Sequence, residues 1–347
     1  MSHDTARVER AALETDAAPH PVLALLRTSV GRNAGLVVAL LLICAVGVLT
    51  VGDRFASSDN ALTILRLAAG IGIVSIGMTF VIIGGGIDLS VGAIVALSSV
   101  WCTTLSTRMM AEDTHWVLMV AVALLVGAGC GLVNGLLIAY GNIVPFIMTL
   151  AMLASARGLA EIISDKKTQT LTGGGVDVGG FKDFFNGDFL GVTVQIWIFV
   201  LVAIAGWILL NRTTFGRRTV AVGGNTEAAR LAGINVKRHT VYLYVLVGFC
   251  SGLAAVMLIA KTTTGSSTHG TLWELDAIAA VVIGGTLLTG GRGTIVGTVL
   301  GVLIFQTITN IFILNNRSFS EQSLFKGAII VAAVLLQQRL ASRSSST

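Results

Sequence analysis

Long apolar runs separated by short polar segments make up most of the chain. A helix needs about 20 apolar residues to cross the hydrocarbon core of a membrane, and ten runs come near that length. We therefore predict an all-α, polytopic membrane protein of about ten transmembrane helices. The predicted spans are 35–52, 61–83, 87–106, 116–139, 143–163, 193–210, 240–260, 272–289, 293–313 and 324–338.

The composition agrees with this pattern and excludes several other classes of protein. Hydrophobic residues occupy 54% of the 347 positions and charged residues only 12%, whereas soluble domains carry about 25% charged residues. A soluble enzyme, a nucleic-acid binder, a disordered chain and a disulfide scaffold are therefore disfavoured. The net charge of +5 fits an excess of Lys and Arg in cytoplasmic loops.

The charges also suggest an orientation and a division of the chain. We expect a cytoplasmic N-terminal tail over 1–34, a transmembrane domain over 35–338 and a cytoplasmic C-terminal tail over 339–347. The loop 211–239 is the strongest cytoplasmic candidate because cytoplasmic loops are enriched in Lys and Arg. Its six basic residues are Arg212, Arg217, Arg218, Arg230, Lys237 and Arg238.

Two pairs of spans are joined by very short glycine-rich segments, near 84–88 and 289–293. Each join is either a hairpin or a break in a helix at membrane depth. Irregular backbone at that depth has to be buried in protein or line a water-filled cavity. A faint similarity between 86–92 and 291–297 is too short to establish an internal repeat.

Glycines at intervals of four residues lie on one face of three predicted helices, at 127–135, 248–252 and 293–301. Small faces allow helix backbones to approach closely, so these stripes predict a tightly packed bundle. The longest outer segment, 164–192, is rich in glycine and polar residues and looks too short and polar for a core of its own. We interpret it as a loop that caps the external face, or as a long connection.

Ionisable residues are rare inside the spans because burying a charge in the membrane is costly. Asp88 follows the triple glycine, Arg157 and Glu161 are one helical turn apart, and Glu274 and Asp276 open a span. Each has a structural explanation: a helix N-terminus satisfies Glu274 and Asp276, Asp88 fixes the glycine-rich break, and Arg157 can pair with Glu161. A role in a translocation pathway is the alternative for the three remaining carboxylates.

Uncharged polar residues inside the spans allow two interpretations. The amides of Asn134, Gln306 and Asn310 can bind neutral hydroxyl groups, or they can join two helices by hydrogen bonds. The four cysteines lie singly in apolar runs and the five histidines are scattered. We therefore expect neither disulfides nor a metal site.

The motifs of common enzymes are missing from the sequence. It contains no phosphate-binding loop with its Lys, no Gly-x-Ser-x-Gly and no His-Glu-x-x-His. We expect no catalytic residues and no cofactor in this chain. If ATP powers its activity, the ATPase is a separate polypeptide.

The most distinctive local pattern lies in the loop 211–239. The segment 223–235 begins with turn residues, Thr226 can cap a short helix over 227–232, and Gly233 ends that helix. A short exposed helix between spans is suited to contact a partner protein. An ordinary amphipathic helix at the membrane surface is the alternative.

Several motifs resemble those of a known family. Glu-Ala-Ala at 227–229 with Gly233 resembles the first half of the coupling motif of ABC importer permeases, although the usual downstream Leu-Pro is missing. Gly-Gly-Ile-Asp-Leu-Ser-Val-Gly at 85–92 and the stretches 274–286 and 290–298 resemble ribose-type sugar permeases. The related amino acid permeases are not expected to carry Gly-Ile-Asp-Leu-Ser-Val-Gly. The resemblance covers about residues 55–338.

This resemblance implies a permease subunit of a bacterial ABC importer for a monosaccharide, in the inner or plasma membrane. Its partners would be a second permease subunit (a copy or a paralogue), cytoplasmic ATPase subunits that bind the ATP, and a periplasmic or lipid-anchored sugar-binding protein. The implied ATPase contact comprises Thr226, Glu227, Ala228, Ala229, Arg230 and Gly233. The weaker candidates for the pathway or its gates are Asp88, Ser90, Asn134, Glu274, Asp276 and Asn310.

Two other functions remain as alternatives. An ion-coupled secondary transporter of a small polar solute would need no ATPase, and an intramembrane enzyme would need converging acids, nucleophiles or metal ligands. The sequence identifies neither the sugar nor the composition of the dimer.

Overall fold

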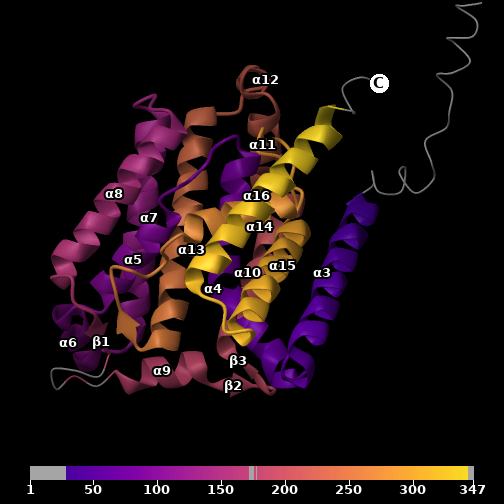
Figure 1. Ribbon diagram of the computed structural model, residues 1–347. Coiled ribbons are helices and arrows are strands. Elements are labelled where there is room, and N and C mark those ends of the chain that lie inside the picture. Colours follow the sequence, from indigo (N-terminus) through magenta and orange to yellow (C-terminus); the bar gives the residue numbers. More distant parts are fainter. Residues whose placement is uncertain (1–28, 172–175, 177, 343–347) are drawn as a thin grey trace, which may run out of the picture.

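The computed structural model describes residues 29–171, 176 and 178–342 and shows a bundle of helices (Figure 1). The helices are α3 (Ser29–Val51), α4 (Ser58–Ile83), α5 (Val91–Cys102), α6 (Leu105–Asp113), α7 (Val117–Ala139), α8 (Pro145–Ser164), α9 (Gly179–Asn186), α10 (Val194–Arg212), α11 (Thr214–Gly224), α12 (Thr226–Leu231), α13 (Val236–Thr262), α14 (Trp273–Ile283), α15 (Ile295–Leu314) and α16 (Phe319–Ser342). A 3-10 turn, η1 (Gly52–Arg54), follows α3.

Extended structure is confined to four two-residue strands. They are β1 (Gln169–Thr170), β2 (Asp188–Phe189), β3 (Val192–Thr193) and β4 (Thr264–Gly265). Strand β1 pairs with β4 and β2 with β3, both antiparallel. The prediction of an all-α fold is therefore confirmed.

A helix occupies each of the ten predicted spans. Seven helices in the described part of the chain are long and apolar enough to cross a membrane: α3, α4, α7, α8, α10, α13 and α15. Helices α5 and α14 have only 12 and 11 residues, and a helix rises about 1.5 Å per residue. Neither crosses about 30 Å of hydrocarbon alone, so the number of ten crossings stays a prediction.

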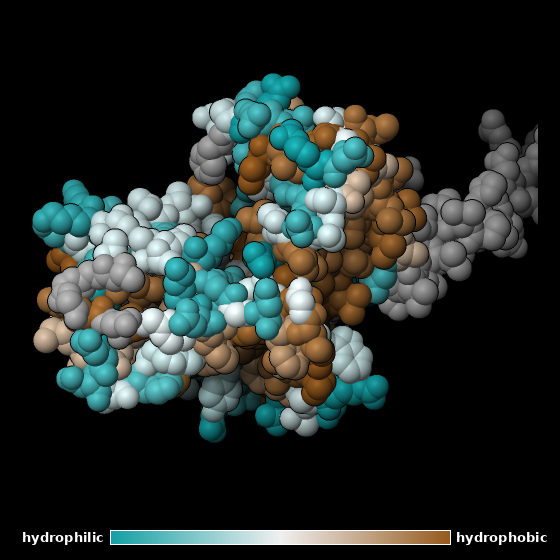
Figure 2. All heavy atoms as spheres, turned by 90° about the horizontal axis from the view of Figure 1, so that it is seen from below, coloured by the Kyte–Doolittle hydropathy of each residue, from teal (hydrophilic) through white to brown (hydrophobic). Residues whose placement is uncertain are grey.

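Helices α4 and α13 form the centre of the bundle, and α3 stands at its edge (Figure 1). All residues of α4 from Ala68 to Ile83 are buried, whereas Leu41, Leu42 and Leu49 of α3 are exposed. Exposed leucines are expected where a helix faces lipid. Figure 2, viewed onto the end of the bundle that carries α9, shows hydrophilic side chains spread over that end and hydrophobic surface prominent along one flank.

Glycine stripes bring helix backbones together as predicted. A Cβ at Gly131 of α7 would overlap the carbonyl oxygen of Tyr244 in α13, and one at Gly248 would overlap the carbonyl of Gly127. Gly301 of α15 lies equally close to the carbonyl of Ala280 in α14. Since only a residue without a side chain permits these contacts, the stripes are a packing feature.

Both glycine-rich joins are stretches of non-helical backbone that the protein buries in part, with Gly85, Thr289 and Arg292 exposed. Helix α4 ends at Ile83, α5 begins at Val91, and Asp88 and Ser90 between them are fully buried. A second non-helical stretch, 265–272, runs beside α5, because Gly265 contacts Thr103 and Ser99 while Gly270 contacts Gly92. Burial within the bundle is the condition that irregular backbone at membrane depth has to satisfy.

The segment 164–192, which was expected to face outward, contains regular structure. Helix α9 buries Phe181 and Phe185, which contact the ring of Trp116. Asn186 ties the helix to α13 by donating a hydrogen bond to the carbonyl of Ala260 at 2.8 Å. The segment thus packs its aromatic side chains against Trp116, outside the segment, instead of forming a core of its own, and α9 lies across one end of the bundle (Figure 1). Residues 172–175 and 177 of the expected cap lie outside the described residues.

The start of α3 and the end of α16 lie at the same end of the bundle as α12 (Figure 1). This arrangement agrees with termini on the same side as the loop 211–239. Most of the expected tails, 1–28 and 343–347, lies outside the described residues.

Candidate functional site

Helix α12 forms where a short helix was predicted, but a different residue caps it. The Asn225 side-chain oxygen accepts a hydrogen bond of 2.9 Å from the Ala228 amide, which satisfies one of the free N–H groups at the helix start. Thr226 is already helical, and its hydroxyl donates to the carbonyl of Val222 at 2.9 Å. The expectation that Thr226 is the cap is wrong, because Asn225 has the extended backbone that a cap requires.

The end of α12 is confirmed at Gly233. Its φ is +83°, a conformation that glycine adopts without steric cost. The amide of Ile234 then donates to the carbonyl of Ala229 at 3.0 Å. Ala229 is buried under the helix with 4% of its surface exposed, while Leu231 is 78% exposed. The helix thus rests on the bundle by one side and presents the other outward.

Glu227 and Arg230 pair on the outer side of α12. The guanidinium donates to both carboxylate oxygens, at 2.6 Å and 3.2 Å. Both side chains are about two-thirds exposed. The hydrogen bond and charge of Arg230 hold the pKa of Glu227 below its usual value, so Glu227 carries its charge at neutral pH.

A groove lies past the end of α12, next to the segment 233–235. It has a volume of about 500 Å³ and separates the start of α11 from the segment that follows α12. Two arginines give it a basic character. Its lining residues are Thr214, Phe215, Arg218, Gly233, Ile234, Asn235, Arg238, His239 and Tyr242.

The residues just before α12 contact both glycine-rich breaks. A Cβ at Gly223 would overlap the carbonyl oxygen of Ile83 and lie 2.8 Å from the amide of Gly291. That amide donates to the same Ile83 carbonyl at 2.8 Å. Gly290, at φ +86°, lies against Gly85 and the carbonyl of Gly223. Three glycine segments that are far apart in the sequence thus meet at one junction.

Asp88, Ser90 and Asn134 form a single buried cluster. The Asp88 carboxylate accepts from the amide of Ser90 at 2.8 Å and from its hydroxyl at 2.5 Å, and Asn134 donates to that hydroxyl at 2.9 Å. The cluster therefore connects the α4–α5 break to α7. One oxygen each of Asp88 and Asn134 has no hydrogen-bond partner among the described residues.

Arg157 holds the non-helical stretch 265–272 in place. Its guanidinium donates to the carbonyl of Ser267 and, at 2.9 Å, to that of His269. Glu161, the expected partner of Arg157, instead lies 3.9 Å from Lys166. Arg157 is a structural residue as expected, but it binds backbone carbonyls.

The two acidic residues at the start of α14 have separate surroundings. Glu274 faces Gly92 of α5, and one of its buried oxygens has no hydrogen-bond partner in the described chain. Asp276 accepts a hydrogen bond from Lys326 of α16 at 2.8 Å, and both side chains are mostly buried. The helix N-terminus alone therefore does not account for Asp276.

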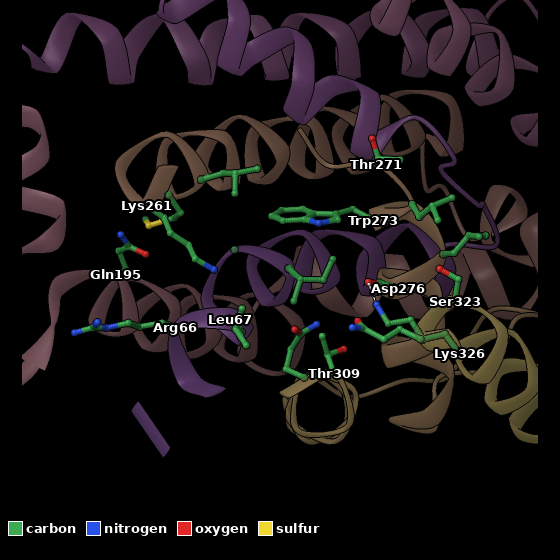
Figure 3. A pocket seen from close by; sticks show the side chains of 18 of the residues that line it. Arg66, Leu67, Gln195, Lys261, Thr271, Trp273, Asp276, Thr309, Ser323 and Lys326 are labelled. Carbon is green, nitrogen blue, oxygen red and sulfur yellow. Dashed lines mark hydrogen bonds and ion pairs between the residues drawn. The ribbon is translucent and has the colours of Figure 1, made fainter. Parts of the chain in front are cut away.

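Asp276 and Lys326 line a cavity of about 400 Å³ (Figure 3). The cavity lies between α4, α10 and α13 to α16, among the parts of these helices that are remote from α12. Its lining residues are Arg66, Leu67, Gly70, Ile71, Gln195, Met257, Leu258, Lys261, Thr271, Leu272, Trp273, Leu275, Asp276, Gln306, Thr309, Gln322, Ser323, Lys326 and Gly327.

The three polar amides inside the spans divide between the two interpretations. Asn134 joins α7 to Ser90, and Asn310 joins α15 to α4 by donating to Asn60 at 2.8 Å. Gln306 forms no hydrogen bond with any described residue and lines the cavity. Helix joining thus accounts for both asparagines, and Gln306 keeps its hydrogen-bonding capacity.

The structure brings together only some of the sequence candidates. Asp88, Ser90 and Asn134 form one cluster, while Glu274, Asp276 and Asn310 each lie elsewhere. Nothing in the sequence indicates that Trp273, Lys261 and Lys326 surround one cavity, because their convergence depends on helix packing. The described residues contain no group of three or more metal-binding side chains, and the four cysteines are free.

Comparison with known proteins identifies relatives over most of the chain. The ribose import permease protein of Bacillus subtilis (strain 168) is 44% identical over 299 residues, which cover 86% of this chain and 91% of that protein. The ribose import permease protein of Escherichia coli (strain K12) is 37% identical, with coverage of 87% and 92%. The L-arabinose ABC transporter permease protein of Azospirillum brasilense is 38% identical, with coverage of 88% of each chain.

No solved structure shows a significant match. The family model described as "Branched-chain amino acid transport system / permease component" matches residues 60–334. This match covers most of the transmembrane bundle, including α12 and both glycine-rich breaks. The chain therefore belongs to this family of membrane transport permeases.

Proposed function

We propose that this chain is the membrane subunit of an ATP-driven importer for a monosaccharide such as a pentose or a hexose. The observation that carries the proposal is the position of α12, which is exposed on one side and joined on the other to both glycine-rich breaks through Gly223. The relatives named for ribose and arabinose transport support the sugar class.

In this proposal the cytoplasmic ATPase subunits bind at α12. Thr226, Glu227, Ala228, Ala229, Arg230 and Gly233 build the helix and its end, and the basic groove beside it provides a second contact surface. ATP is bound by the ATPase subunits and not by this chain. Movement of α12 acts on the α4–α5 and α14–α15 breaks directly, because Gly223 contacts Ile83 and Gly291.

The proposal also sets the orientation and the other partners. The end with α12 faces the cytoplasm, together with both termini, and the end with α9 receives sugar from a periplasmic or lipid-anchored binding protein. A second permease subunit completes the assembly in the bacterial inner membrane. The buried cluster at Asp88 fixes the first helix break, and the region around Glu274 and Asp276 belongs to the outer half of the pathway.

The test is sugar-stimulated ATP hydrolysis and uptake in proteoliposomes. They would contain this chain, its ATPase and its binding protein, with pentoses, hexoses and polyols as substrates. Glu227→Lys reverses a charge on the exposed side of α12 and should abolish both activities. The control is Asp113→Lys, which reverses an exposed charge at the end of α6, away from α12, and should leave ATP hydrolysis measured without the binding protein unchanged.

Two results would contradict the proposal. One is uptake driven by a proton or sodium gradient without ATP, which would establish the secondary transporter as the correct function. The other is full activity of the Glu227→Lys variant, which would remove α12 from the ATPase contact. No observation in the structure favours the secondary transporter.

A further inference from the structure

The cavity lined by Asp276 and Lys326 contains polar groups that the protein itself leaves unused. Gln306 is only 6% exposed, yet its side-chain amide forms no hydrogen bond with any residue that the structure describes. A primary amide offers two N–H donors and one carbonyl acceptor. An occupant of the cavity that offers hydroxyl groups would satisfy it.

Trp273 supplies a second kind of contact. Its indole ring lies across the middle of the cavity (Figure 3), and its N–H has no hydrogen-bond partner within the described chain. An indole therefore offers one flat apolar face and one free donor at the same place. This combination suits a molecule that has both C–H surfaces and hydroxyl groups.

Most charged residues around the cavity already form ion pairs or hydrogen bonds with other residues of the protein. Lys326 is paired with Asp276 at 2.8 Å, and the Arg66 guanidinium donates to the Thr193 hydroxyl at 2.7 Å outside the lining. Lys261 is the one lining cation that forms neither an ion pair nor a hydrogen bond in the described residues. A multiply charged anion would find a single free cation there, whereas a neutral hydroxyl-bearing molecule finds an amide, an indole N–H and an ammonium as partners.

We propose that this cavity is a binding site for a neutral polyhydroxylated molecule, with Trp273 against its C–H face and Gln306 and Lys261 bonded to its hydroxyl groups. The volume of about 400 Å³ falls in the range of roughly 300–1,000 Å³ typical of small-molecule sites. The identification of this molecule as the transported sugar rests on the proposed import function. The site then receives the sugar in the outer half of the bundle, before the helix breaks.

The binding site can be tested on the permease alone, without an ATPase. Thr309 lines the cavity, so Thr309→Cys in a background without the four native cysteines places a thiol there. The variant would be reconstituted in nanodiscs and labelled with a water-soluble methanethiosulfonate reagent. The control is Thr114→Cys, an exposed position at the end of α6 outside the cavity.

We expect ribose or arabinose at high millimolar concentration to slow labelling of Thr309→Cys by at least threefold and to leave Thr114→Cys unaffected. Unchanged labelling in the presence of the pentoses and hexoses tested would overturn the site. The site would also be overturned if, without sugar, Thr114→Cys were labelled and Thr309→Cys were not. The cavity would then be closed to water. Protection by the matching sugar acid but not by the sugar would overturn the assignment to a neutral molecule.

Transport measurements separate the site from the import function. With wild-type ATPase and binding protein, Gln306→Ala and Trp273→Phe should lower the maximal uptake rate about tenfold, which corresponds to about 1.4 kcal/mol. ATP hydrolysis should change less than about twofold, since α12 is intact. Trp101→Ala removes an exposed tryptophan outside the cavity and should have no effect on uptake.

The outcomes of the two proposals are distinguishable. If the wild-type assembly shows no ATP-driven sugar uptake, the import function fails, while protection of Thr309→Cys still measures the binding site. If the wild type transports sugar and both cavity variants transport at its rate, the site is not on the sugar's path. Because Trp273→Phe keeps an aromatic ring at this position, a loss of activity in this variant is not explained by misfolding.

Discussion

The amide of Gly291 donates a hydrogen bond of 2.8 Å to the carbonyl oxygen of Ile83. This bond joins the break after α4 to the break after α14, although the two residues are far apart in the chain. Gly223 packs against the same carbonyl, so the end of α11, three residues before the exposed helix α12, contacts both breaks. A displacement of α12 would therefore act directly on the backbone of both breaks.

The first prediction concerns this junction. Gly223→Ala should destabilise the protein by about 1–3 kcal/mol, because the added methyl group overlaps the Ile83 carbonyl and overpacking costs about that much. The measurement is the midpoint of thermal unfolding in detergent. Gly224→Ala is the matched control, since a Cβ at Gly224 meets no atom within 4 Å. Equal midpoints for the two variants would contradict the junction.

The second prediction concerns the contact between α7 and α13. Gly131→Ala should be strongly destabilising because its methyl group would overlap the Tyr244 carbonyl and the Val245 backbone. Gly129→Ala, two residues away on the same helix, meets no atom within 4 Å and should be neutral or slightly stabilising, since alanine favours helix. Thermal unfolding of the pair checks this, and a larger loss for Gly129→Ala would contradict the observed packing.

The third prediction concerns the hydrogen bond between Asn310 and Asn60. Asn310→Ala removes the donor and leaves the buried Asn60 oxygen unpaired, which should cost about 1–3 kcal/mol. The double variant Asn60→Ala, Asn310→Ala should lose less than the sum of the single variants, since the two side chains interact. Unfolding free energies for the full cycle provide the test. Strict additivity would show that the bond contributes nothing.

The fourth prediction concerns the ion pair of Asp276 and Lys326. Lys326→Met should destabilise the protein because it leaves a mostly buried carboxylate without its partner. The double variant Asp276→Asn, Lys326→Met should recover part of the loss, since no uncompensated charge remains. Thermal midpoints of the wild type and the three variants decide this. A double variant less stable than Lys326→Met would contradict it.

The sequence predicted the elements of this fold better than their contacts. Apolar runs located the seven helices long and apolar enough to cross a membrane in the described residues, and the glycine spacing predicted the backbone contact of α7 with α13, because both follow from local periodicity. The cap of α12 was assigned to Thr226 instead of Asn225, since a choice between adjacent capping residues depends on backbone geometry. The aromatic core under α9 was missed because Phe181 and Phe185 find their partner, Trp116, only after folding.

The candidate site was predictable only where its residues lie in one segment of the chain. The short helix at 226–233 has its own start and end signals, so it was identified from the sequence. The cavity was not, because Trp273, Gln306 and Lys326 come from three helices, and only Gln306 and Asp276 among its lining residues stood out in the sequence. The sequence around Lys326 in α16 does not indicate that its side chain pairs with Asp276 of α14.

The interlocked glycines of α7 and α13 also restrict how this bundle moves. A relative slide by one residue, about 1.5 Å, would carry side-chain-bearing positions into the carbonyl contacts that Gly127, Gly131 and Gly248 permit. The two helices therefore travel as one rigid body. Hinges have to lie where the helical hydrogen bonds are already absent, at the backbone before α5 and on either side of α14.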